Sequence, residues 1–135
     1  LCVFMELYVE LVGREFYGEA FFGGATSDEV KASVRERLTK NLAALKRLVK
    51  FSPYIAGTDF TLADAAAYAT LPAVAQAAKA VLGEDLVTAA GIDWKPYLKM
   101  LGERPAVQRV NADRKRDAEA ATAAAAAKAA AAAKG

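Results

Sequence analysis

The chain contains no histidine, and this absence removes several kinds of chemistry at once. Without an imidazole there is no Ser-His-Asp arrangement, no histidine general base and no histidine metal ligand. Cys2 is the single cysteine, which excludes an internal disulfide and a cysteine-based zinc site. We therefore expect no metal site, and catalysis, if present, needs another group. The lone thiol favours a reducing, cytoplasmic setting, in which Cys2 serves as a small apolar side chain.

Strong net charge and long apolar runs are also absent. The formal net charge of +2 is too small to indicate a nucleic acid or an anionic membrane as a partner. Glu6 and Glu10 interrupt the apolar start, so no run approaches the roughly 20 residues that a membrane helix needs. The opening lacks the basic leader and cleavage site of a signal peptide, and position 1 is Leu1. A chain that opens within an apolar pattern is expected to be a piece of a longer protein.

The composition and the spacing of apolar residues predict helices. The 135 residues are 55% hydrophobic and 25% charged, which fits one soluble domain with one core. Apolar residues recur at helical spacing from Phe4 to Phe16, and Gly23-Gly24 is the expected end of this first helix. Thr26 and Glu29 have capping-box spacing and predict the start of a second helix. Its apolar stripe consists of Val30, Val34, Leu38, Leu42, Leu45 and Val49. We interpret its lysines and arginines as a solvated face and not as a binding patch.

The stretch "GTDFTLADAAAYA" contains a stronger helix start. Thr61 and Asp64 repeat the capping-box arrangement, with the aspartate three residues after the cap. The helix that follows is almost uncharged until Lys79 and is rich in alanine, so we expect it to be the buried centre of a bundle. Pro72 is expected to kink or divide it. Because no run of alternating β-branched residues is long enough for a strand, the fold class is all-α.

The C-terminal part predicts shorter elements and a tail. Asp93 is a candidate cap for a helix that carries Trp94 as a packing anchor, and Pro105 suits the first position of another helix. Residues 118–135 are an alanine-rich segment of low complexity without an apolar stripe, which we expect to be a flexible or semi-helical spacer. A basic cluster precedes it, diluted by acidic residues, and a nucleic-acid contact there is disfavoured. The cluster consists of Arg109, Arg114, Lys115 and Arg116.

The order of four features resembles one family. "ELYVELVGREFY", "FSPYIAGTDFTLADAAAYA", Trp94 and "ERPAVQRV" follow one another as in the C-terminal all-helical domain of bacterial-type cytosolic glutathione transferases. The resemblance covers about residues 1–117 and implies a helical bundle around a buried central helix, followed by the tail at 118–135. A threonine cap with an aspartate three residues later, opening a buried helix, is the folding signature of that family.

The resemblance also implies a division of labour. In such enzymes a thioredoxin-like domain, absent from this chain, binds most of the substrate glutathione and supplies the residue that acts on its thiol. The helical domain provides a wall of the site for a small hydrophobic electrophile and much of the homodimer surface. By this resemblance the pocket-facing residues are Phe4, Tyr8, Val12 and Glu15, with Tyr8 first because its hydroxyl can enter an apolar pocket. An aromatic stripe at helical spacing equally fits a core.

Thr61 and Asp64 are interpreted as structural caps, and Asp64→Ala is expected to destabilise the domain by about 1 kcal/mol or somewhat more. Two classes of function remain open. One is a piece of a glutathione transferase, inactive alone. The other is a non-catalytic interaction module with the same helical fold, and fold alone does not separate them. The sequence does not identify the electrophile.

Overall fold

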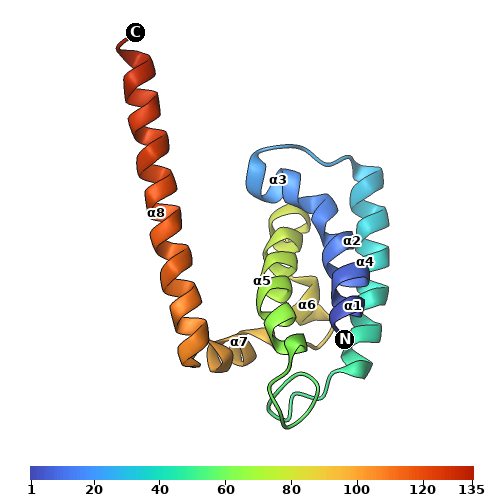
Figure 1. The fold of residues 1–135 in the computed structure, drawn as a ribbon. Coiled ribbons are helices and arrows are strands. Elements are labelled where there is room, and N and C mark those ends of the chain that lie inside the picture. The colour runs from blue at the N-terminus through green and yellow to red at the C-terminus, as the bar shows by residue number, and fades with distance from the viewer. The chain divides into compact units, whose positions relative to one another are not determined.

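The computed structural model describes residues 1–135 and confirms the all-α prediction (Figure 1). In chain order the elements are α1 (Cys2–Phe4), η1 (Met5–Glu10), α2 (Leu11–Gly13), η2 (Arg14–Phe16), α3 (Tyr17–Phe22), α4 (Asp28–Leu48), α5 (Leu62–Leu82), α6 (Leu86–Ala89), α7 (Trp94–Gly102) and α8 (Pro105–Ala133). There is no sheet, and one isolated β-bridge joins Tyr54 to Gly57. The chain divides within α7 into two compact units, Leu1–Leu98 and Lys99–Gly135, which are described separately.

Residues 2–22 form one continuous helical run, which we call the first helix. It ends as predicted at Gly23, whose left-handed backbone (φ 70°) is a conformation that glycine adopts without strain. The run is not uniform, because η1 has π-helical and η2 has 3-10 hydrogen bonding, which side-chain spacing did not predict. At Gly13 a Cβ would lie 3.0 Å from Cγ2 of Val74 in α5. The missing side chain therefore permits a close approach between the first helix and α5.

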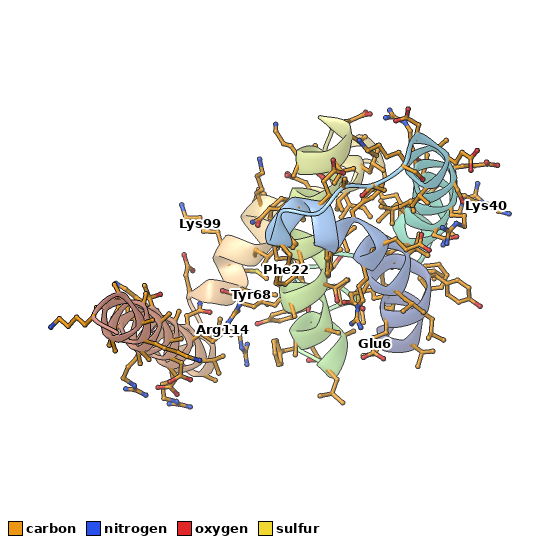
Figure 2. The ribbon with its side chains drawn as sticks, turned by 90° about the horizontal axis from the view of Figure 1, so that it is seen from above. Glu6, Phe22, Lys40, Tyr68, Lys99 and Arg114 are labelled. Atoms are coloured by element: carbon orange, nitrogen blue, oxygen red, sulfur yellow. The ribbon has the colours of Figure 1, made fainter.

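The second predicted helix is α4, but the predicted cap is wrong by one residue. Ser27, not Thr26, is the N-cap, and its Oγ accepts a hydrogen bond from the Val30 amide at 3.3 Å. Ser27 has extended backbone angles directly before the first helical residue, so the third helical position is Val30 and Glu29 cannot complete a capping box there. The core-facing residues are Val34, Leu38, Leu42 and Leu45. Figure 2 shows Lys40 pointing away from the bundle, as a solvated face requires.

The central helix of the bundle is α5, which packs against the first helix and α6. Its capping box is formed as predicted, and Pro72 does not divide it. Most of its buried residues are small, and they include Leu71 and Val74 as the larger members. Burial is nevertheless one-sided, since Leu62 at the start of the helix is 82% exposed and Ala65 and Ala69 are exposed along the same side. Alanine allows close packing but does not by itself enforce it.

The second unit, Lys99–Gly135, is dominated by α8. Pro105 occupies the start of this helix as predicted, and no side chain of α8 is buried. The alanine-rich segment is helical as far as Ala133, which agrees with the high helix propensity of alanine. None of the helices in the protein combines the length and the apolar character that crossing a membrane would require.

Candidate functional site

The four predicted pocket residues lie in different surroundings on the first helix. Tyr8 is 51% exposed, and its ring lies 5.1 Å from the ring of half-buried Phe4, centroid to centroid. Val12 is buried in the core. The carboxylate of Glu15 forms an ion pair with Arg37 of α4. The structure thus brings Phe4 and Tyr8 together at the surface, while Val12 points inward and Glu15 is held by a partner.

A larger exposed apolar surface surrounds Tyr8. Val3, Leu7 and Leu11 follow one another at four-residue spacing and are 63%, 51% and 51% exposed. We call the surface formed by Val3, Leu7, Tyr8 and Leu11 the outer face of the first helix. Of these four residues Tyr8 alone was predicted to face a pocket, although the apolar character of the first turns on nearly every side was a usable signal for the others. Contiguous apolar surfaces are uncommon on monomeric proteins, so the outer face is the candidate binding surface of the first helix.

Polar contacts connect the first helix to α4 along its length. The Asn41 side-chain amide donates a hydrogen bond of 2.7 Å to the carbonyl oxygen of Tyr8. The Arg37–Glu15 pair lies farther along, and Lys31 approaches Glu19 to 3.5 Å near the end of the helix. These three contacts are spread over three turns, and fully buried side chains on the inner side of the helix anchor it in the core. The outer face is therefore presented by a rigidly held element.

Thr61 and Asp64 lie at the start of α5, where the structure supports the structural role predicted for them. The Asp64 carboxylate is fully buried and accepts from the backbone amides of Thr61 and Ile55, each at 2.9 Å, and from the Tyr97 hydroxyl at 2.5 Å. Burial, together with the hydrogen bond to Asp64, raises the pKa of Tyr97 far above its ordinary value. The ring of Phe51 packs edge-on against Tyr97 at 4.9 Å. With its acceptor positions occupied, Asp64 joins a loop, a helix start and α7.

A second carboxylate, Asp85, was missed because residues 84–93 were interpreted as a loop or short turn. Asp85 caps α6, accepting from the amides of Val87 and Thr88 at 3.0 and 3.1 Å, and from the Thr88 hydroxyl at 2.6 Å. The Trp94 indole N–H donates to the same carboxylate at 2.9 Å. Partial burial raises the pKa of Asp85, but the hydrogen bonds together outweigh it and leave the pKa below its ordinary value. Trp94 is thus held by a hydrogen bond as well as by packing.

Comparison with known proteins agrees with this architecture. The family model for the glutathione S-transferase C-terminal domain matches residues 28–109, so the chain belongs to that family. A curated protein of Pseudomonas putida named glutathione S-transferase is 36% identical over 110 residues. The match covers 82% of this chain and 50% of the relative, so the chain spans about half the length of that relative. The resemblance inferred from the sequence motifs is confirmed.

Proposed function

We propose that this chain is the helical half of a glutathione transferase, and that the outer face of the first helix forms a wall of the electrophile site and part of a dimer surface. The observation that carries the proposal is the exposed apolar surface of Val3, Leu7, Tyr8 and Leu11 on a rigidly held helix. An isolated domain gains nothing from exposing such a surface, whereas a thioredoxin-like domain and a second subunit would cover it.

The chemistry divides between the two halves of such an enzyme. Glutathione is the substrate, bound mainly by the thioredoxin-like domain, which lowers the pKa of its thiol so that the thiolate attacks a small hydrophobic electrophile. The helical half supplies no reacting group. It holds the electrophile close to the sulfur and limits water near the reacting atoms, which raises the rate by orientation.

Tyr8 is the central residue of the proposed wall. Its ring leans on Phe4, and its half-exposed position allows the hydroxyl to donate to a polar substituent of the electrophile while the ring contacts the apolar part. Val12 and Glu15 remain predicted pocket residues. The burial of Val12 and the ion pair of Glu15 favour supporting roles behind Tyr8. We further propose that the complete enzyme is a cytoplasmic homodimer.

The test joins the N-terminal half of the Pseudomonas putida relative to residues 1–135 and measures conjugation of glutathione to 1-chloro-2,4-dinitrobenzene. We expect the fusion to be active and the 135-residue chain alone to be inactive. Tyr8→Ala in the fusion should raise KM for the electrophile about five- to tenfold, as expected for losing roughly 1 kcal/mol of aromatic contact, with a smaller change in KM for glutathione. Conjugation by the isolated chain at an ordinary rate would contradict the proposed division of labour.

A matched pair of leucines controls for general effects of surface truncation. Leu7 lies on the outer face and is 51% exposed, while Leu48 at the end of α4 is 49% exposed. Leu7→Ala should weaken electrophile binding or dimerisation, and Leu48→Ala should affect neither. Unchanged kinetics in both Tyr8→Ala and Leu7→Ala would contradict the proposed wall. A folded, dimeric fusion without conjugating activity would instead favour the non-catalytic interaction module.

A further inference from the structure

A hollow of about 430 Å³ lies between α4 and α6. One wall is a single stripe of α4 formed by Arg35, Thr39 and Ala43, which are four residues apart. In Figure 1 α6 is drawn between α5 and the first helix, and no residue of the first helix lines the hollow. Its volume is within the range of small-molecule sites. The hollow is therefore a second candidate site, separate from the outer face of the first helix.

The body of the hollow is apolar and lined by small side chains. Ala89 and Ala90 at the end of α6 face Ala43 across it, and Leu86 behind them is only 4% exposed. Because alanine side chains end at Cβ, the space between the two helices stays open. The lining suits a flat or short apolar group, with the Thr39 hydroxyl available on the α4 wall.

An ion pair lies on the wall of the hollow, and a further cation lies near its lining. Arg35 forms an ion pair with Glu84, and both side chains are about half exposed. Cε of Lys46 lies 3.7 Å from the position that a Cβ on Gly91 would take. Lys46 continues the stripe of α4 that carries Arg35. Arg35 and Glu84 are thus the charged residues of the lining, and Lys46 is a second cation beside Gly91, the residue that follows the lining residue Ala90.

We propose that this hollow binds a small amphipathic carboxylate, such as an aromatic or short-chain carboxylic acid. Its carboxylate takes the place of Glu84 on the Arg35 guanidinium, and its apolar body lies on Ala43, Ala89 and Ala90. In the absence of ligand, the Glu84 carboxylate makes the contact with the Arg35 guanidinium that the ligand carboxylate makes when bound. Release of Glu84 costs little because a half-exposed ion pair contributes little to stability. The ligand then gains affinity from the apolar contact with the three alanines together with the guanidinium contact, which is strongest when it is made through two hydrogen bonds.

The proposal is tested by titrating the isotope-labelled 135-residue chain with 2-naphthoate and following backbone amide signals by NMR. For a ligand of this size we expect a Kd of about 1 mM or lower. The signals that shift should belong to Thr39, Ala43, Ala89 and Ala90. Shifts confined to the first helix would overturn the proposal. The neutral analogue 2-naphthylmethanol should bind at least about tenfold more weakly, since it lacks the charge that Arg35 recognises, and equal binding of the two compounds would also contradict it.

Two variants that break the same ion pair should have opposite effects on binding. Arg35→Gln removes the recognising group and should weaken 2-naphthoate binding about tenfold or more. Glu84→Gln removes the competing carboxylate and should tighten binding several-fold. If the pair were important only for the shape of the domain, both variants would weaken binding, and that result would overturn the proposal.

The control is Arg37→Gln on the same helix. Arg37 is 45% exposed at its side chain and ion-paired like Arg35, but it pairs with Glu15 on the side of α4 that meets the first helix. Its loss should leave 2-naphthoate binding unchanged, and a loss of affinity equal to that of Arg35→Gln would show nonspecific electrostatic attraction. Ala89→Leu fills the hollow without changing any charge and should abolish binding, and unchanged affinity in that variant would contradict the proposed position of the ligand.

Discussion

Two alanine-rich helices of this protein have opposite surroundings. In α5, alanines alternate with Leu71 and Val74, and much of the helix is buried beneath the first helix and α6. In α8, a charged first half is followed by runs of alanine, and no side chain is buried. The starts differ as well, because α5 has a capping box and α8 has no side-chain cap. Alanine supplies helix propensity in both cases, but larger apolar neighbours and a buried cap determine which helix joins the core.

The largest effect should come from removing the buried cap of α5. Asp64→Ala leaves the amides of Thr61 and Ile55 and the hydroxyl of Tyr97 without their acceptor. We expect a loss of about 3 kcal/mol in the free energy of unfolding, more than the value predicted from the capping box alone, because several buried donors lose their partner. Urea denaturation measures it. Asp59→Ala in the exposed part of the loop should be nearly neutral, and an equal loss there would mean that Asp64 has no special role.

A smaller change in stability should distinguish α5 from α8 when an alanine in each is replaced by leucine. Ala67 in α5 is completely buried, whereas Ala125 in α8 is exposed. Ala67→Leu should destabilise the protein by about 1–3 kcal/mol because the core has no room for the added atoms. Ala125→Leu should change stability by less than about 0.5 kcal/mol. Thermal unfolding of the two variants makes the comparison, and equal midpoints would show that α5 is not tightly packed.

The smallest effect is a dependence on pH at the cap of α6. Since the pKa of Asp85 is lowered in the folded protein, its stabilising effect is complete above the ordinary pKa of an aspartate and is lost as the pH falls through the folded-state pKa. Asp85→Asn should therefore be less stable than the unchanged protein near pH 6, and the difference should shrink in acid. Chemical denaturation followed by Trp94 fluorescence measures it. Asp117→Asn in exposed α8 should match the unchanged protein throughout, and a constant difference for Asp85→Asn would contradict the assignment.

Much of the fold could be predicted from local sequence signals. The capping box at Thr61 and Asp64, the end of the first helix at Gly23 and the start of α8 at Pro105 each depend on residues within a few positions of one another. The shift of a cap to Ser27 is a small local error, because adjacent threonine and serine offer the same chemistry and only the backbone angles distinguish them.

Contacts between distant residues could not be predicted in this way. Tyr97 reaches Asp64 across 33 positions, and Trp94 reaches Asp85 from the start of another helix. For the candidate site, helical spacing placed Tyr8 beside Phe4 correctly. It could not reveal that Glu15 pairs with Arg37, since that contact depends on how α4 lies against the first helix.

The hydrogen bonds of Asp64 also have a consequence for the order of folding. Its bond to the Thr61 amide closes a very short loop and can form as soon as α5 begins, whereas the bond to Tyr97 must close a much longer one and bears a larger entropic cost. The same carboxylate thus takes part in an early, local event and a late, distant one. The start of α5 would then belong to the folding nucleus. The Tyr97 hydrogen bond would form after the transition state, so that it mainly lowers the rate of unfolding.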